Sequence, residues 1–396
     1  MRGWNSVIQR QPSPSGPAGS VCNVITLWFV LVLGLLTTCT ARADRVDDLI
    51  HALSSPSVST RDDAAQTLAR VKSRRAVPGL IHALGDPVEA VRGQAIRALA
   101  ATLHRTDEPL LLTLLQDRDS SRRRAAATLL GILGDGRAVG PLVKAANDTA
   151  PAVRRAAAEA LGELGDTRGA SALRAHLDDP DPRVRLKAVV ALGRLRDSGS
   201  AMRIVSLLHE RQHDIQSAAA MALAQIGNPE IGPALIKIIG QKPGADTFDV
   251  RFYAAYALGA LGDRRAAPPL LAGLTADNPY MRAASAAALG RLHDPTAVEP
   301  LLKALRDPHR FVRFTAAQAL GGLRDRRAVA GLSAGLKDED EDVREQCAKA
   351  LGRIGDRRAV PALIAAFGDS DEAIPKAAVL ALGRIGDSSA LPGRKH

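Results

Sequence analysis

The sequence predicts an all-α protein, an α-α superhelical solenoid built from about eleven helix-pair repeats. One motif recurs throughout the chain, as in VRRAAAEALG from Val153 and VRLKAVVALG from Val184. Its copies begin at positions 60, 91, 122, 153, 184, 215, 250, 281, 312, 343 and 374. The period is 184 − 153 = 31 residues, and only the step from 215 to 250 is longer. A constant period of this length is typical of stacked structural repeats.

Each repeat is expected to contain two helices. In one copy, apolar or small residues follow the helical period at Val343, Cys347, Ala350, Leu351 and Ile354. They predict a helix with one core-facing side. Asp356 then stands where it can cap the next helix, and Pro361 lies near that helix's first turn, where no free N–H is needed. Neither helix can bury its apolar side alone, so neighbouring repeats must share one core.

The composition is consistent with such a core and sets limits on the partner. Hydrophobic residues make up 46% of the chain but aromatic residues only 3%, so Ala, Leu and Val must fill the interior. The formal net charge is +11. Residues 1–43 contain three Arg and no acidic residue, which leaves 53 − 3 = 50 basic against 42 acidic residues in the remainder. This modest excess does not by itself indicate an anionic partner.

The N-terminal segment, residues 1–43, is predicted to be a signal peptide or membrane anchor. It has a basic start, an apolar run from Val24 to Leu36, and the sequence Ala41-Arg42-Ala43, which fits an A-x-A cleavage site. Two alternatives stay open: an uncleaved anchor through residues 21–39, or lipidation at Cys39, because LTTC resembles a bacterial lipobox. We therefore expect an exported, periplasmic or extracellular protein with a repeat solenoid over 44–392 and a C-terminal tail over 393–396.

The repeat pattern VRxxAAxALGxLGDxRAVPPL resembles the HEAT repeat superfamily, specifically the short HEAT-like repeats of the phycobilisome (PBS) lyase type. The resemblance extends from about Asp44 to Pro392. It implies an α solenoid that serves as a protein-binding scaffold or adaptor, and it leaves two enzymatic alternatives. One is a relative of deoxyhypusine hydroxylase, which is built from similar repeats and binds a di-iron centre through several His-Glu dyads. The other is a bilin lyase, against which export argues.

One segment resembles a zinc site. His209-Glu210-Arg211-Gln212-His213 has the H-E-x-x-H spacing by which a helix holds zinc in many metalloproteases. Superposed on the preceding repeat, however, these residues align with the turn sequence DDPDP at 178–182, so the two histidines should straddle a turn. His209-Glu210 is also the only His-Glu dyad in the chain, and Cys347 is the only cysteine after residue 43. We predict no enzyme activity, no metal and no cofactor.

Aspartate and arginine recur at fixed repeat positions near the predicted turns. In six repeats they stand six residues apart, as Asp86 and Arg92, Asp117 and Arg123, Asp148 and Arg154, Asp179 and Arg185, Asp307 and Arg313, and Asp338 and Arg344. We predict that they form a hydrogen-bonded ladder that maintains the fold, because a guanidinium group satisfies carboxylates and turn carbonyls together. These arginines therefore do not indicate a nucleic-acid surface, and export also argues against that partner.

Four Arg-Arg pairs follow the helix-ending turns, at 74–75, 264–265, 326–327 and 357–358. They are expected to gather along one edge of the solenoid. Two interpretations stay open: the pairs form a solvated edge, or they meet an anionic envelope surface.

The aromatic residues predict a partner-binding patch. Seven of the eight that follow residue 43 lie between 248 and 314. The proposed patch consists of Phe252, Tyr253, Tyr256, Tyr280, Phe311 and Phe314, on the second helices of their repeats, which in solenoids commonly line the concave face. The alternative is that these rings only fill space beside the longer repeat step. We predict a monomer that binds a protein partner of unknown identity.

Overall fold

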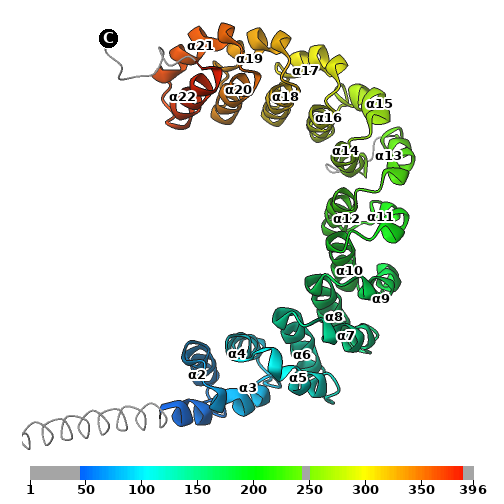
Figure 1. Cartoon of the computed structure of the whole chain (residues 1–396), viewed down its shortest axis with the longest axis vertical. Helices are drawn as coiled ribbons and strands as arrows, with labels where there is room; N and C mark the ends of the chain where they lie inside the picture. The colour runs from blue at the N-terminus through cyan, green and yellow to red at the C-terminus, as the bar shows by residue number, and fades with distance from the viewer. Residues whose placement is uncertain (1–44, 243–249, 387–396) are drawn as a thin grey trace, which may run out of the picture. The chain divides into compact units, whose positions relative to one another are not determined.

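The computed structural model describes residues 45–242 and 250–386, and all regular secondary structure in these ranges is helical (Figure 1). This confirms the predicted all-α class. Contacts divide the chain into two units, residues 1–104 and 105–396. The predicted signal peptide or anchor, Cys39 and the C-terminal tail lie outside the described residues. In the described part of the chain, no helix is long and apolar enough to span a bilayer.

The first unit contains the earliest helix pairs. A helix over 45–52 is followed by α2 (Val58–Val71), the short 3-10 turn η1 (Arg74–Ala76), α3 (Val77–Ala83) and α4 (Glu89–Thr102). Helices α2 and α4 pack against each other, and α3 packs against α4. The core side chains Leu68, Leu80 and Leu99 are completely buried, which is the packing that the apolar stripes predict.

The second unit alternates short and long helices. The short helices are α5 (Glu108–Leu114), α7 (Val139–Ala145), α9 (Ala170–Ala175), α11 (Ala201–Leu207), α13 (Gly232–Ile239), α15 (Ala267–Gly273), α17 (Val298–Ala304), α19 (Val329–Gly335) and α21 (Val360–Ala365). The long helices are α6 (Ser120–Leu133), α8 (Pro151–Leu164), α10 (Pro182–Arg194), α12 (His213–Ile226), α14 (Val250–Leu261), α16 (Pro279–Leu292), α18 (Arg310–Leu323), α20 (Glu341–Ile354) and α22 (Ala373–Ile385). Consecutive long helices pack side by side and form one layer, and the short helices form the other (Figure 1).

A glycine permits the close approach of neighbouring long helices. A Cβ atom placed on Gly321 of α18 would lie 2.8 Å from Cα of Ala350 in α20. The same relation holds between Gly290 and Ala319, where the distance would be 2.6 Å. Real Cβ atoms do not approach so closely, so packing requires glycine at these two positions of the recurring ALG sequence.

A short turn connects each long helix to the next short one. In one repeat, α20 ends at Ile354 and is followed by Gly355, whose φ of +72° favours glycine. Asp356 then accepts a hydrogen bond from the main-chain N–H of Arg358 at 2.9 Å, and Pro361 lies in the first turn of α21. Asp356 is therefore a cap, as predicted, but it caps the 3-10 turn η11 (Arg357–Ala359) that precedes α21.

Candidate partner-binding surface

The aspartates and arginines form bonds between repeats as well as within them. Arg154 donates from Nε and Nη2 to the two carboxylate oxygens of Asp179, at 2.7 and 2.8 Å, and from Nη1 to the main-chain oxygen of Asp148 at 3.0 Å. The carboxylate that Arg154 binds thus lies in the next repeat. The aspartate six residues before Arg154, Asp148, offers it the main-chain carbonyl oxygen and not the carboxylate. The same two-part arrangement joins Arg123 to Asp148, Arg282 to Asp307, Arg313 to Asp338 and Arg344 to Asp369.

The remaining ladder positions have other partners. In the first unit, Arg61 binds the carboxylate of Asp86 at 2.6 Å, while Arg92 donates to the main-chain oxygen of Asp86. In the second unit, the carboxylate of Asp117 accepts hydrogen bonds from Arg122 at 3.3 Å and from the main-chain N–H of residue 119 at 2.8 Å. Every predicted ladder residue therefore makes a structural contact.

The hydrogen bonds of the ladder lower the pKa of its carboxyl groups. The hydrogen bond from Arg123 lowers the pKa of Asp148 below its usual value. Burial acts to raise the pKa of Asp179, but the bonds from Arg154 and from the main-chain N–H of Asp181 outweigh it, so this pKa is also lowered. These carboxylates are charged in the folded protein and are bound within it, so they are not available to a ligand.

The zinc-like segment belongs to this ladder. Helix α11 ends at Leu207 and α12 begins at His213, so His209 lies in the turn and the two histidines are not on one helix. Glu210 accepts a hydrogen bond from Arg185 at 3.2 Å, in the place that Asp179 occupies one repeat earlier. Across residues 45–242 and 250–386, no group of three or more potential metal ligands is found.

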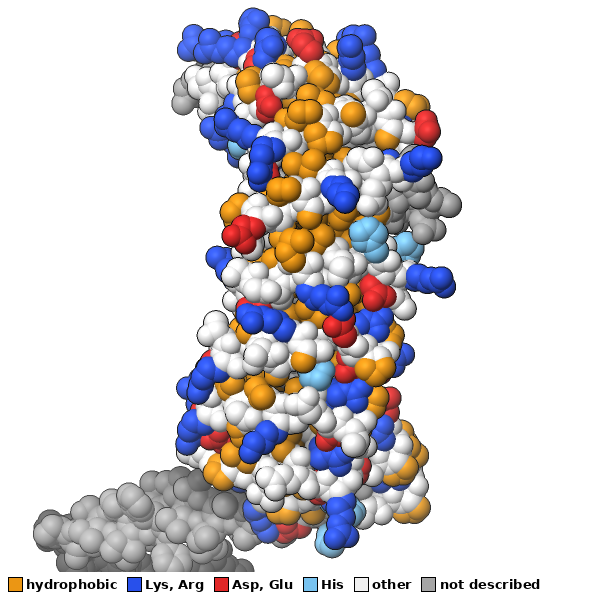
Figure 2. All heavy atoms as spheres, turned by 90° about the vertical axis from the view of Figure 1, so that its right-hand side faces the viewer, with side chains coloured by type: hydrophobic (Ala, Val, Ile, Leu, Met, Phe, Trp, Pro, Cys, Tyr) orange, Lys and Arg blue, Asp and Glu red, His pale blue; other side chains and the backbone are white. Residues whose placement is uncertain are grey.

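The two arginines of an Arg-Arg pair differ in their contacts. The second arginine is structural: Arg327 pairs with Asp325 at 2.7 Å and donates to the main-chain oxygen of Pro295 in the preceding repeat at 3.1 Å. The first is more solvated, and the side chain of Arg326 is 81% exposed. On the face shown in Figure 2, basic and acidic side chains are interspersed, with apolar side chains between them. The ion pairs of Arg327 with Asp325 and of Arg358 with Asp356 reduce the basic charge that these pairs can offer to an anionic surface.

The aromatic residues of α14 lie in two environments. Tyr256 is 37% exposed, and the guanidinium carbon of Arg291 in α16 lies 5.2 Å from its ring centroid. Phe252 is half-buried and packs edge-on against Tyr253 at 5.1 Å. Tyr253 itself is only 6% exposed, so its assignment to the patch is wrong. One residue advances a helix by about 100°, which turns Tyr253 toward the core beside the outward-facing Phe252.

The other aromatic residues lie at the first turns of α16 and α18. The ring centroids of Tyr280 and Phe311 are 6.4 Å apart, and His309 lies 5.7 Å from Tyr280 and 5.6 Å from Phe311. Phe311 is 46% exposed, while Tyr280 and Phe314 are half-buried. Sequence reasoning missed His309, although it stands at the same repeat position as Asn278, between two predicted aromatic residues.

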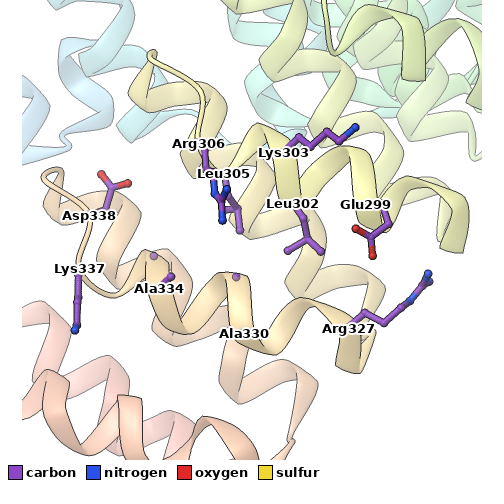
Figure 3. A pocket seen from close by; sticks show the side chains of 12 residues that line it. Glu299, Leu302, Lys303, Leu305, Arg306, Arg327, Ala330, Ala334, Lys337 and Asp338 are labelled. Carbon is purple, nitrogen blue, oxygen red and sulfur yellow. The ribbon is translucent and has the colours of Figure 1, made fainter.

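Hollows also lie between the short helices of the second unit. One of about 570 Å³ separates α17 from α19, with Leu302 and Arg306 on one side and Ala330 and Ala334 on the other (Figure 3). A second of about 450 Å³ separates α19 from α21. Both arise because α19, with the sequence VAGLSAG, carries few bulky side chains.

The fold and this surface define a class: repeat solenoids that expose an extended layer of long helices. Models of HEAT repeats match residues 46–129, 108–193, 171–247, 202–278, 267–338 and 329–393. The chain therefore belongs to the HEAT repeat family, as its sequence pattern indicates. A search of curated proteins found no significant match.

Solved structures with the same fold include karyopherins. The chain is similar to Kap95 in the Kap95:Nup1 complex, with 15% identity, a TM-score of 0.65, and coverage of 96% of this chain and 60% of that one. It is also similar to yeast importin-beta (Kap95p), with 16% identity, a TM-score of 0.61, and coverage of 86% and 54%. A third is the karyopherin Kap121p bound to the extreme C-terminus of the protein phosphatase Cdc14p, with 13% identity, a TM-score of 0.51, and coverage of 85% and 45%. At these identities the similarity establishes the fold alone, and the chain spans 60% or less of each of these karyopherins.

Proposed function

We propose that the chain is an exported, non-catalytic scaffold or adaptor at the cell envelope. It binds a protein partner along the face of its long helices, which the sequence predicts to be concave. The observation that carries this proposal is the gathering of exposed and half-buried aromatic side chains on three consecutive long helices. These side chains are Phe252 and Tyr256 on α14, Tyr280 on α16, and Phe311 and Phe314 on α18.

Such a surface is suited to protein binding for a physical reason. Aromatic side chains bury a large area with few rotatable bonds, and a few of them commonly supply most of the affinity of an interface. Helices α14, α16 and α18 pack consecutively, so one extended partner can contact all three. The Cdc14p-bound karyopherin supports the proposal, because it shows a solenoid of this fold holding a protein segment.

The envelope location rests on the N-terminal sequence. A basic start, an apolar run and an A-x-A sequence before Asp44 are typical of an exported precursor. Cell fractionation with N-terminal sequencing tests this part. A mature chain that begins at Asp44 in the periplasm or medium supports cleavage, and an intact cytoplasmic chain contradicts export.

Partner binding is tested by crosslinking in the envelope followed by mass spectrometry. The variant Phe252→Ala/Tyr256→Ala should lose a partner that the wild-type chain captures. The matched control is Ser217→Ala/Met221→Ala, because these residues hold the same repeat positions in α12, and Met221 is 52% exposed. Equal capture by all three proteins contradicts the aromatic surface. Circular dichroism verifies that each variant remains helical.

A further inference from the structure

A small hollow lies beside the aromatic residues, at the first turns of α18 and α20. Its volume is about 180 Å³, and it is lined by Arg310, Phe311, Phe314, Asp340 and Asp342. Phe311 is 46% exposed, so the chain's own side chains cover only part of this ring. The lining thus combines apolar ring surface with carboxylates.

The charge around the hollow is negative. Residues 338–342 are five consecutive acidic residues, a run that occurs nowhere else in a chain with net charge +11. Asp338 is bound by Arg313, which also pairs with Glu339 at 3.0 Å. Asp342 is exposed and forms no ion pair with another residue that the structure describes, whereas Glu341 lies close enough to Arg344 to raise the pKa of its guanidinium group. The charge of Asp342 is therefore available to a ligand.

The chain's own Arg310 shows which chemistry fits these groups. Its guanidinium carbon lies 5.0 Å from the ring centroid of Phe311, and its Nη1 lies 3.2 Å from a carboxylate oxygen of Asp340. A cation is stabilised by both an aromatic face and a carboxylate. The Arg310 side chain is 57% exposed, so solvent reaches the ring and the carboxylate around it. Phe314 and Asp342 offer the same combination of ring and carboxylate in the same hollow.

We infer that this hollow accepts an arginine or lysine side chain from a basic segment of a protein partner. The inference rests on the proposed function, because it specifies the chemistry of the protein that the long-helix face binds. The aliphatic stem of the incoming side chain lies on the rings, and its charged end meets the carboxylates. An uncharged side chain would desolvate Asp342 without pairing it, and an anionic one would be repelled.

The test is a calorimetric titration of the full chain with two peptides. One is acetylated (Arg-Leu)₃-amide, and the other replaces each arginine by citrulline, which has nearly the same shape but no charge. The arginine peptide should bind more tightly. Phe311→Ala and Asp342→Asn should each weaken it by about two- to fivefold, the contribution expected of an exposed cation–ring contact. Arg310→Ala should strengthen it, because this change frees Phe311 and Asp340 and removes a like charge.

The chain offers a matched control for the carboxylate. Asp214 holds the repeat position of Asp342 in α12, where the preceding repeat carries Arg183 and Leu186 in place of Phe311 and Phe314. Asp214→Asn should leave peptide binding unchanged, and thermal melts show whether every variant is folded. Equal binding of the citrulline peptide, or weaker binding by Arg310→Ala, overturns the inference.

These outcomes are distinct from failure of the proposed function. A partner captured through Phe252 and Tyr256, together with no preference for the arginine peptide, overturns only the inference about the hollow. Arginine-selective binding with no protein captured in the envelope supports the hollow and counts against the scaffold function.

Discussion

Arg154 and Asp179 belong to neighbouring repeats, and two hydrogen bonds of 2.7 and 2.8 Å join the guanidinium group of one to the carboxylate of the other. Their side chains are only 13% and 3% exposed. This bond crosses from one repeat to the next, while a third bond from Arg154 to the carbonyl of Asp148 holds the turn of its own repeat.

Asp179→Ala should therefore destabilise the protein. It leaves the guanidinium group of Arg154 largely buried without its carboxylate, which should lower the free energy of unfolding by about 1–3 kcal/mol. Urea unfolding measures the change. Asp178→Ala is the control, because Asp178 pairs with Arg203 at the surface and is 60% exposed, so its loss should cost less than about 1 kcal/mol. Equal effects of the two substitutions contradict the structural role of the ladder.

The ladder should make stability depend on acid pH. The pKa values of Asp148, Asp179 and Asp307 are lowered in the folded chain, and that of Asp356, the cap of η11, is also lowered, to about 2. Such groups stabilise the fold above their unfolded pKa, near about 3.9, and this contribution is lost as the pH falls through the folded values. The free energy of unfolding should therefore fall between about pH 4 and pH 2.

Urea titrations at fixed salt across this pH range give the measurement. Glu163 acts in the opposite direction, because burial raises its pKa. Its single contribution is outnumbered by those of the ladder. A stability that is constant or rises on acidification contradicts the prediction.

Two glycine substitutions should have opposite signs. Gly321→Ala places a Cβ 2.8 Å from Cα of Ala350, and relieving this overlap should cost about 1–3 kcal/mol. Gly383 holds the same repeat position in α22 but has no atom within 4 Å of such a Cβ. Gly383→Ala should stabilise by about 0.4–1 kcal/mol, because alanine restricts the unfolded chain. Thermal melts measure the change in stability of each variant. If both substitutions change stability in the same direction, the contact between helices is not the reason for the glycine.

Substitutions in the zinc-like segment should separate metal binding from stability. His209→Ala/His213→Ala should leave metal content unchanged, since the two residues do not share a helix. Glu210→Ala should destabilise less than Asp179→Ala, because Arg185 donates a single bond of 3.2 Å to Glu210. Elemental analysis and urea unfolding test both points. Stoichiometric zinc lost with the two histidines would restore the metalloprotein interpretation.

Periodicity alone predicted the helices, because the core-facing positions recur at one nearly constant interval. It also placed the Asp and Arg columns correctly but did not identify which arginine binds which aspartate. The six-residue spacing is local in sequence, whereas the carboxylate bonds join one repeat to the next and depend on how the repeats stack.

The candidate site was less predictable than the fold. The clustering of aromatic residues identified Phe252 and Phe314, but the neighbouring Tyr253 points into the core. The hollow beside Phe311 was not predicted, because its residues come from two repeats. Only the packing of α20 against α18 places Asp342 next to the aromatic rings.

The contact between glycine and alanine has a consequence for how such a chain changes in length. Helices α16, α18 and α20 each present a glycine to the following long helix and an alanine to the preceding one, as Gly290 meets Ala319 and Gly321 meets Ala350. If one whole repeat, from Met281 to Phe311, were deleted, Gly259 of α14 would face Ala319 in place of Ala288, and the two surfaces would still match. Gene duplication or loss can therefore add or remove whole modules without redesigning an interface. An insertion of any other length must instead fall between helices, as the longer step does between the end of α13 and the start of α14.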